Sequence, residues 1–155
     1  FINLQKKVFC QYSECSEEIM KLDITIIGYI TTFENVTKTD VKECFYNKNK
    51  QLVFIVKEGQ GRKAVGKKGL HIRKLERLIK KKIKIIEFNS KVEEFVKNII
   101  FPLKSPEVKL EEDVLKVKTD SMQLKALLLG REKANLKELQ EIVGRYFNNV
   151  KIVID

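Results

Sequence analysis

The sequence predicts an α+β fold made of two consecutive copies of one unit, each with the order helix, strand, strand, helix, helix, strand. Residues 65–72 (VGKKGLHI) align with residues 129–136 (LGREKANL), every position lying 64 residues later. In both copies an extended pair of strands precedes this segment, and an apolar helical pattern with a β-rich run follows it. Repetition of a whole supersecondary pattern is a more specific signal than any single motif. The chain is therefore expected to contain two small modules.

The first module is expected over residues 16–89. Ser16, followed by two glutamates, is typical of a helix start, and apolar residues then recur at helical spacing as far as Phe33. The β-branched stretch 24–27 would equally suit a strand, so both interpretations stay open there. After the first helix the predicted elements are strands at 41–46 and 52–57, helices at 62–65 and 70–81, and a strand at 82–88. The residues of the helix at 70–81 that are expected to face inward are Ile72, Leu75, Leu78 and Ile79.

The second module is expected over residues 90–155. Ser90, with a glutamate three residues later, fits a capping box and predicts a helix that Pro102 and Pro106 close. Asp120 resembles the cap of a further helix. The remaining predicted elements are strands at 107–110 and 114–118, helices at 120–129 and 134–147, and a strand at 150–154.

All of the net positive charge lies in one segment, residues 57–84. This segment holds twelve Lys and Arg residues against two glutamates, a surplus equal to the net charge of +10 of the whole chain. A diffuse surplus of charge would only favour solubility. A compact basic segment is the electrostatic footprint of a site that binds a polyanion.

At the centre of the basic segment lies a glycine turn, residues 66–69, between two predicted helices. Its residues are Gly66, Lys67, Lys68 and Gly69. Such a turn places backbone N–H groups and a helix N-terminus at one spot, which attracts phosphate, and its glycines let a sugar–phosphate backbone approach closely. Val65, Ile72 and Ile85 then supply an apolar wall for bases. The alternative is a purely architectural turn with solvated lysines, but the localised charge and the repeat favour phosphate binding.

The order of elements, with GxxG between two adjacent helices, resembles a type II KH domain. The resemblance implies a three-stranded mixed sheet in each module. It also implies that single-stranded RNA is held at the GxxG loop, with its bases read in an adjacent apolar groove. Two abutting copies in one chain are similar to the archaeal NusA-like transcription factors. Residues 53–60 (VFIVKEGQ), 64–72 (AVGKKGLHI) and 93–98 (EEFVKN) carry this likeness.

Carried onto this chain, the resemblance implies an RNA-binding role for the first glycine turn and its surroundings. The predicted RNA-contacting residues are Arg62, Lys63, Val65, Gly66, Lys67, Lys68, Gly69, Ile72, Arg73, Lys80, Lys81, Lys82 and Ile85. The turn contacts phosphate, Ile72 packs beneath the bases, and residues 80–82 hold the far side of the nucleic acid. The implied function is a transcription elongation or termination factor that holds nascent single-stranded RNA, with RNA polymerase as its protein partner.

The second turn departs from this pattern. It keeps Gly130 but has Lys133 in place of the closing glycine, and Glu132 puts a negative charge where phosphate is expected. One interpretation is a weaker second RNA site made by Gly130, Arg131 and Lys133. The other is a module retained for packing or for a protein partner, which the lack of a basic surplus in residues 85–155 favours.

No catalytic residue, metal site or cofactor is predicted. The sequence places no nucleophile or carboxylate beside His71, the only histidine. The three cysteines lack metal-ligand spacing and are expected to be free thiols in a reducing cytosol. Because no run of about 18 uncharged apolar residues occurs, no membrane span is predicted. With free thiols, the expected location is the cytoplasm.

Two other functions stay open from the sequence. The chain would also suit a KH protein that associates with the ribosome or assists its assembly, or a KH scaffold that binds proteins. Residues 1–15 form an N-terminal segment to which the sequence assigns no role, and the oligomeric state is not predicted.

Overall fold

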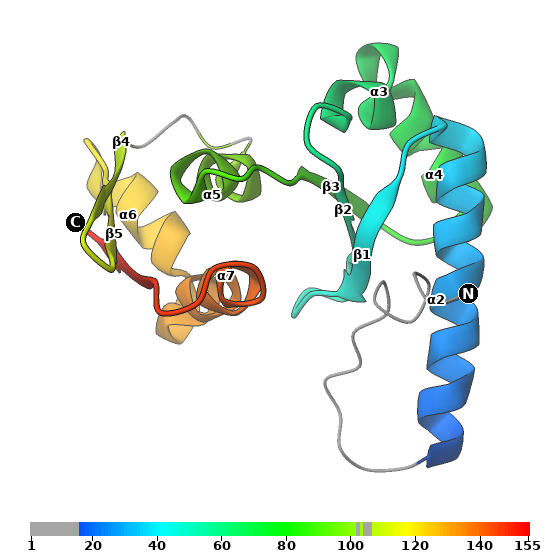
Figure 1. Ribbon diagram of the computed structural model, residues 1–155, viewed down its shortest axis with the longest axis horizontal. Coiled ribbons are helices and arrows are strands. Elements are labelled where there is room, and N and C mark those ends of the chain that lie inside the picture. The colour runs from blue at the N-terminus through cyan, green and yellow to red at the C-terminus, as the bar shows by residue number, and fades with distance from the viewer. Residues whose placement is uncertain (1–15, 102, 104–106) are drawn as a thin grey trace. The chain divides into compact units, whose positions relative to one another are not determined.

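The computed structural model describes residues 16–101, 103 and 107–155 (Figure 1). The chain divides into two compact units, Phe1–Phe88 and Asn89–Asp155, each with its own sheet and helices. The fold is α+β, as the sequence predicts. Residues 1–15, and the two prolines expected to close the first helix of the second module, lie outside the described residues.

The first unit has the predicted order of elements, and the stretch 24–27 is helical. Helix α2 is longer than predicted and continues to Thr37. The elements are α2 (Ser16–Thr37), β1 (Val41–Tyr46), β2 (Leu52–Val56), α3 (Gly61–Val65), the 3₁₀ turn η1 (Lys67–Gly69), α4 (Leu70–Ile79) and β3 (Ile83–Glu87).

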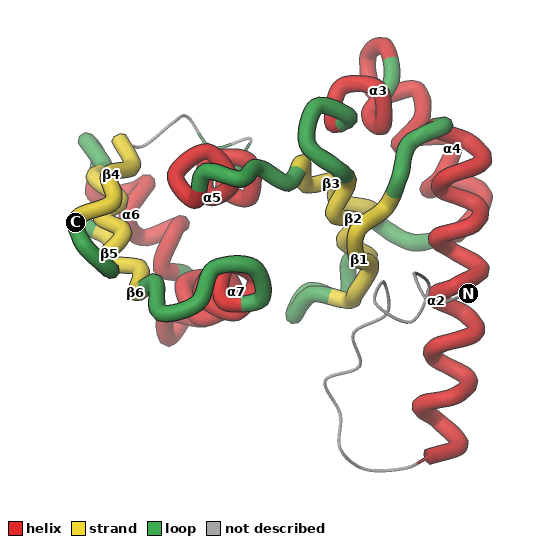
Figure 2. The backbone as a smooth tube through the Cα atoms, viewed as in Figure 1, coloured by secondary structure: helices red, strands yellow, loops and turns green. Residues whose placement is uncertain are grey.

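The sheet of the first unit is mixed. Strand β2 lies at its centre, antiparallel to β1 and parallel to β3. The parallel pair needs a crossover connection, and α3, η1 and α4 supply it. The helices lie on one face of the sheet (Figure 2). The glycine turn joins α3 to α4 within this crossover. Both helices that flank the turn are therefore packed on the sheet.

The core of the first unit lies between α2, α4 and this face of the sheet. The rings of Phe33 and Phe54 stack with centroids 4.3 Å apart. Leu75 is the residue of α4 that is completely buried, and Ala64 is its counterpart in α3. Burial of a leucine side chain contributes about 2 kcal/mol, so Leu75 is a main anchor of the helix that follows the turn.

The helix predicted at 70–81 ends earlier, at Ile79. Lys80 takes a left-handed conformation (φ 59°) and donates its N–H to the carbonyl of Glu76 at 2.8 Å, which ends the helix. Leu78 is 56% exposed, so the prediction that it faces inward is wrong. The helix contacts the core along a narrow stripe centred on Leu75, and Leu78 points about 60° away from that stripe.

The second unit repeats the same order with a second mixed sheet. Strand β5 is central, antiparallel to β4 and parallel to β6. The last helix ends at Gly144 rather than at 147 as predicted. The elements are α5 (Val92–Ile100), β4 (Glu107–Glu111), β5 (Val114–Lys118), α6 (Met122–Leu129), the 3₁₀ turn η2 (Arg131–Lys133), α7 (Ala134–Gly144) and β6 (Lys151–Ile154).

Two predicted helix caps in the second unit are wrong. Lys91, and not Ser90, is the N-cap of α5, and its side chain makes no capping hydrogen bond. At α6 the cap is Ser121 instead of Asp120, because the Ser121 hydroxyl accepts the N–H of Gln123 at 3.2 Å. The polar residue that caps a helix is decided by where the chain turns into it, and neighbouring candidates look alike in sequence.

Candidate nucleic-acid interface

The first glycine turn has an unusual backbone that its sequence explains. Gly66 ends α3 with φ 75° and ψ 172°, a region that essentially only glycine occupies. Lys68 (φ 52°) and Gly69 (φ 72°) are both left-handed, and α4 begins directly after them. The chain therefore leaves one helix and enters the next within four residues.

The hydrogen bonds of this turn leave donors available. Gly66 donates its N–H to Arg62 at 3.0 Å, and Gly69 donates to the carbonyl of Gly66 at 3.3 Å. The backbone N–H groups of Lys67 and Lys68 have no partner among the described residues. Free N–H groups in a turn of this kind form a concavity that suits an anion. The geometry can therefore hold a phosphate oxygen between the two glycines.

The second turn has the same backbone, although its sequence differs. Gly130 has φ 69° and ψ 179°, and Glu132 and Lys133 have φ 55° and 59°. Lys133 donates its N–H to the carbonyl of Gly130 at 3.3 Å, as Gly69 does to Gly66. The loss of the closing glycine has therefore not changed the path of the chain.

The two glycines of the turn are required to different degrees. A Cβ on Gly66 would lie 2.8 Å from Cγ of His71, and one on Gly130 would lie 2.6 Å from Cγ of Asn135. A Cβ on Gly69 would meet nothing within 4 Å. A residue other than glycine can take the left-handed conformation at a cost of about 1 kcal/mol. This is why the second unit tolerates Lys133 but retains Gly130.

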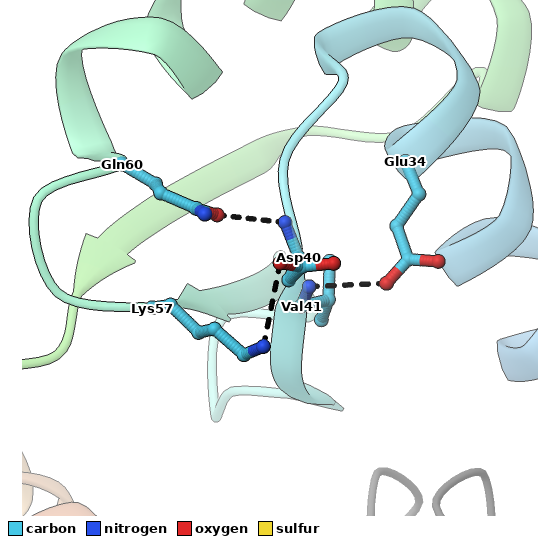
Figure 3. Close-up of polar contacts among 5 residues, drawn as sticks. All are labelled: Glu34, Asp40, Val41, Lys57 and Gln60. Atoms are coloured by element: carbon cyan, nitrogen blue, oxygen red, sulfur yellow. Dashed lines mark hydrogen bonds and ion pairs between the residues drawn. The ribbon is translucent and has the colours of Figure 1, made fainter.

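A network of polar contacts fixes the chain where α3 begins. Gln60 accepts the N–H of Asp40 through its side chain at 2.7 Å, and Lys57 pairs with the carboxylate of Asp40 at 3.3 Å (Figure 3). Beside it, Glu34 at the end of α2 accepts the N–H of Val41 at 3.1 Å (Figure 3). The contacts of Asp40 tie the start of β1 to the segment that leads from β2 into α3, and the contact of Glu34 ties β1 to α2.

Glu87, near the end of β3, holds the same segment from the other side. Its two carboxylate oxygens accept the N–H groups of Gly59 at 3.1 Å and Gly61 at 2.8 Å. A Cβ on Gly61 would lie 2.1 Å from the carboxylate, so glycine is needed for this close approach. Helix α3 is therefore anchored at its N-terminus although it is only one turn long.

The basic residues around the first turn are exposed and unneutralised. Lys57 pairs with Asp40, and Lys84 makes other contacts. Within the described part of the chain the other ten cations of residues 57–84 form no ion pair: Arg62, Lys63, Lys67, Lys68, Arg73, Lys74, Arg77, Lys80, Lys81 and Lys82. All ten are exposed. Their charge is available to a ligand.

The structure gathers some of the predicted RNA-contacting residues and separates others. Arg62 and Lys63 lie in α3, directly before the turn, and Arg73 lies in the first turn of α4. Residues 80–82 follow the other end of α4, which has ten residues and so a length of about 15 Å. They cannot bind the same phosphate as the turn, and only a ligand of several nucleotides would reach both places.

Three apolar residues predicted to line a groove are each partly exposed. Val65 ends α3, Ile72 lies in the first turns of α4, and Ile85 is at the centre of β3. Ile85 also packs against the core of the first unit. Each side chain is therefore partly covered by the protein and leaves part of its apolar surface exposed.

Two side chains that shape the turns were not predicted from the sequence. Nδ1 of His71 donates to the carbonyl of Lys63 at 2.9 Å, and Nδ2 of Asn135 donates to the carbonyl of Leu127 at 2.8 Å. The signal was present, because each of the two residues lies five positions after the first glycine of its turn. Arg73 was predicted to contact RNA, and its guanidinium donates to the carbonyl of Lys68 at 2.6 Å.

Two titratable groups of the first unit, the thiol of Cys44 and the phenol of Tyr46, have raised pKa values. Burial, and then the nearby charge of Glu43, raises the pKa of the Cys44 thiol far above its usual range, so this thiol stays protonated. Burial and the hydrogen bond with Tyr29 raise the pKa of Tyr46 to about 12.

No group of His, Cys, Asp and Glu suited to a metal ion occurs among the described residues. Of the helices described, none has the length and apolar character needed to cross a bilayer.

The element order, the two mixed sheets and the repeated turn between adjacent helices are those of two tandem type II KH domains. No family model matches the chain. A probable transcription termination protein NusA from Methanococcus vannielii is 30% identical over 139 residues, which cover 86% of this chain and 80% of that protein. The protein of the same name from Methanocaldococcus jannaschii is 28% identical over 145 residues, or 90% and 74% of the two chains. The chain therefore belongs to the archaeal NusA-like family.

Other similarities agree with this assignment. A further probable transcription termination protein NusA, from Thermoplasma acidophilum, is 26% identical over 133 residues, covering 82% of this chain and 90% of that protein. Among solved structures, the crystal structure of a protein called APE1850 matches with a TM-score of 0.61 and 28% identity. The match covers 85% of this chain and 99% of that one.

Proposed function

We propose that this protein holds single-stranded, nascent RNA at the first glycine turn and acts in transcription elongation or termination beside RNA polymerase. Membership of the archaeal NusA-like family supports the role in transcription, since three relatives are named as probable termination proteins. We assign residues 16–89 to the first KH domain and residues 90–155 to the second. The protein would act in the cytoplasm without a catalytic step of its own.

One observation carries the RNA-binding proposal. The cations in and around the turn are exposed and lack carboxylate partners among the described residues, and two backbone N–H groups between them are also unpaired. A basic patch of this kind is the electrostatic footprint of a nucleic acid. The turn fits backbone phosphates because charge and hydrogen-bond donors meet where glycine removes steric obstruction.

The other residues take roles according to their place. Lys67 and Lys68 neutralise the phosphates nearest the turn, with Arg62 and Lys63 beside them. Ile72 packs beneath the bases. Val65 and Ile85 continue the apolar wall of the groove. Lys80, Lys81 and Lys82 contact the RNA about 15 Å away, at the other end of α4.

The second turn is proposed as a weaker contact through Gly130, Arg131 and Lys133. Its backbone matches that of the first turn, which supports a residual ability to hold phosphate. Its surroundings are less favourable. Ala126 and Leu127 occupy the positions that correspond, 64 residues earlier, to a pair of cations, and Glu132 repels phosphate.

A titration with single-stranded RNA tests the proposal. The double variant Lys67→Asp/Lys68→Asp is compared with Lys91→Asp/Lys118→Asp, which changes the net charge equally at two exposed positions of the second unit. Loss of two charge-assisted contacts is expected to weaken binding by about 100-fold or more. The slope of log affinity against log salt should fall by about 1.4, which corresponds to two phosphates on a single strand. The control variant should bind nearly as wild type does.

Equal affinities for the two double variants would contradict the proposal. Binding of a protein partner without any binding of RNA would favour a scaffold. Co-sedimentation with ribosomal subunits instead of RNA polymerase would favour a role on the ribosome. Each outcome is read from the full chain, so the result does not depend on either unit folding alone.

A further inference from the structure

Both turns share one side-chain contact, although different residue types make it. The second residue of the following helix, His71 in α4 and Asn135 in α7, folds back over the first glycine of its own turn. Its side-chain nitrogen donates to a carbonyl of the preceding helix, Lys63 at 2.9 Å in the first unit and Leu127 at 2.8 Å in the second. Each carbonyl belongs to the residue three positions before the first glycine of its turn.

The carbonyl needs this partner because the helix stops. In a continuing helix the Lys63 carbonyl would accept the N–H of Lys67, four residues later. Gly66, at φ 75° and ψ 172°, turns the chain away, so the carbonyl is one of those left open at a helix end. The side chain of His71 supplies the missing donor for the Lys63 carbonyl. The bond also joins α3 to α4 across the turn.

Histidine and asparagine are chemically equivalent for this purpose. In both, the donating nitrogen is bonded to Cγ of a planar group, so its distance from the backbone is nearly the same. A carbonyl only accepts, so the Nδ1 of His71 must carry the proton, and the other ring nitrogen is not needed for this bond. Two different residues therefore perform one task in the two units.

We propose that His71 is the positioning residue of the phosphate-binding turn: it fixes the shape of residues 66–69 from one side without contacting RNA, and Asn135 does the same for the second turn. This inference rests on the proposed RNA-binding function. A side chain of the same size without a donor would leave the Lys63 carbonyl without this hydrogen bond and weaken the contact between α3 and α4. The N–H groups of the turn would then be held less firmly in the orientation that binds phosphate.

The test uses a pair of variants of similar shape that differ in the donor. His71→Asn copies the second unit and should bind single-stranded RNA within about twofold of wild type. His71→Leu lacks the donor and should bind about 5- to 10-fold more weakly, which corresponds to one lost hydrogen bond. Without RNA, amide hydrogen exchange at Gly66 and Gly69 should be faster in His71→Leu than in His71→Asn. In the second turn, exchange at Gly130 should be unchanged in Asn135→His and faster in Asn135→Leu.

Two results would overturn the inference. If His71→Leu binds RNA and protects its turn as wild type does, the hydrogen bond has no positioning role. If His71→Asn loses as much affinity as His71→Leu, the imidazole itself meets the RNA. If the wild-type chain binds no RNA, the proposed function fails, while the exchange comparison in the two turns still decides whether these side chains hold them.

Discussion

Replacement of Gly66 by alanine should be far more damaging than replacement of Gly69, although both belong to the same motif. Gly66 has φ 75° and ψ 172°, a region essentially reserved for glycine, where another residue costs up to about 3 kcal/mol. Its new Cβ would also lie 2.8 Å from Cγ of His71, well inside the separation of about 3.5 Å at which carbon atoms attract. Displacement of His71 costs a further hydrogen bond, about 1 kcal/mol. The expected loss for Gly66→Ala is therefore about 3–4 kcal/mol.

Replacement of Gly69 by alanine should cost much less stability than replacement of Gly66. It lies in the left-handed region at φ 72°, and a Cβ there meets nothing within 4 Å. The cost of alanine is about 1 kcal/mol, partly offset because alanine reduces the conformational entropy of the unfolded chain.

Urea and thermal unfolding of the full chain measure the difference. For a domain of this size about 1 kcal/mol shifts the midpoint by roughly 4–8 °C, so Gly69→Ala should lower it by about 5 °C and Gly66→Ala by more than about 12 °C. Amide exchange in α3 and α4 assigns the loss to the first unit. Equal destabilisation by the two substitutions would refute the reasoning, because it would mean that the conformation of Gly66 and the proximity of His71 carry no cost.

Two further predictions concern stability. Lys133→Gly should raise the midpoint of unfolding of the second unit slightly, because relief of the left-handed lysine (φ 59°), worth about 1 kcal/mol, is only partly offset by the larger conformational entropy of glycine in the unfolded chain; an unchanged or lower midpoint would contradict this. Glu87→Ala should lower the free energy of unfolding of the first unit by about 2 kcal/mol, since it leaves the N–H groups of Gly59 and Gly61 without their carboxylate, whereas an effect below about 0.5 kcal/mol would mean that water replaces it fully.

The sequence by itself determined the order of elements, the repeat and the position of the turn. Hairpins, amphipathic helices and glycine turns are local features, and their spacing is written in consecutive residues. The structure confirms the helix that begins at Ser16 and the mixed sheets that the resemblance implies. The basic segment around Lys67 and Lys68 could be read directly, because a charge that has no acidic neighbour in sequence often has none in space.

Tertiary structure decided how each residue is used. Leu78 satisfies the apolar spacing of α4 yet is exposed, because the width of the contact with the core is set by neighbouring elements. Asp120 and Ser121 are both good caps, and the path of the chain selects Ser121. The sequence alone does not tell whether Lys133, in place of the closing glycine, changes the path of the second turn. The structure shows that the backbone is the same, with Lys133 at φ 59° and Gly69 at φ 72°. Only the fold brings His71 to the Lys63 carbonyl, because that contact depends on where two helices meet.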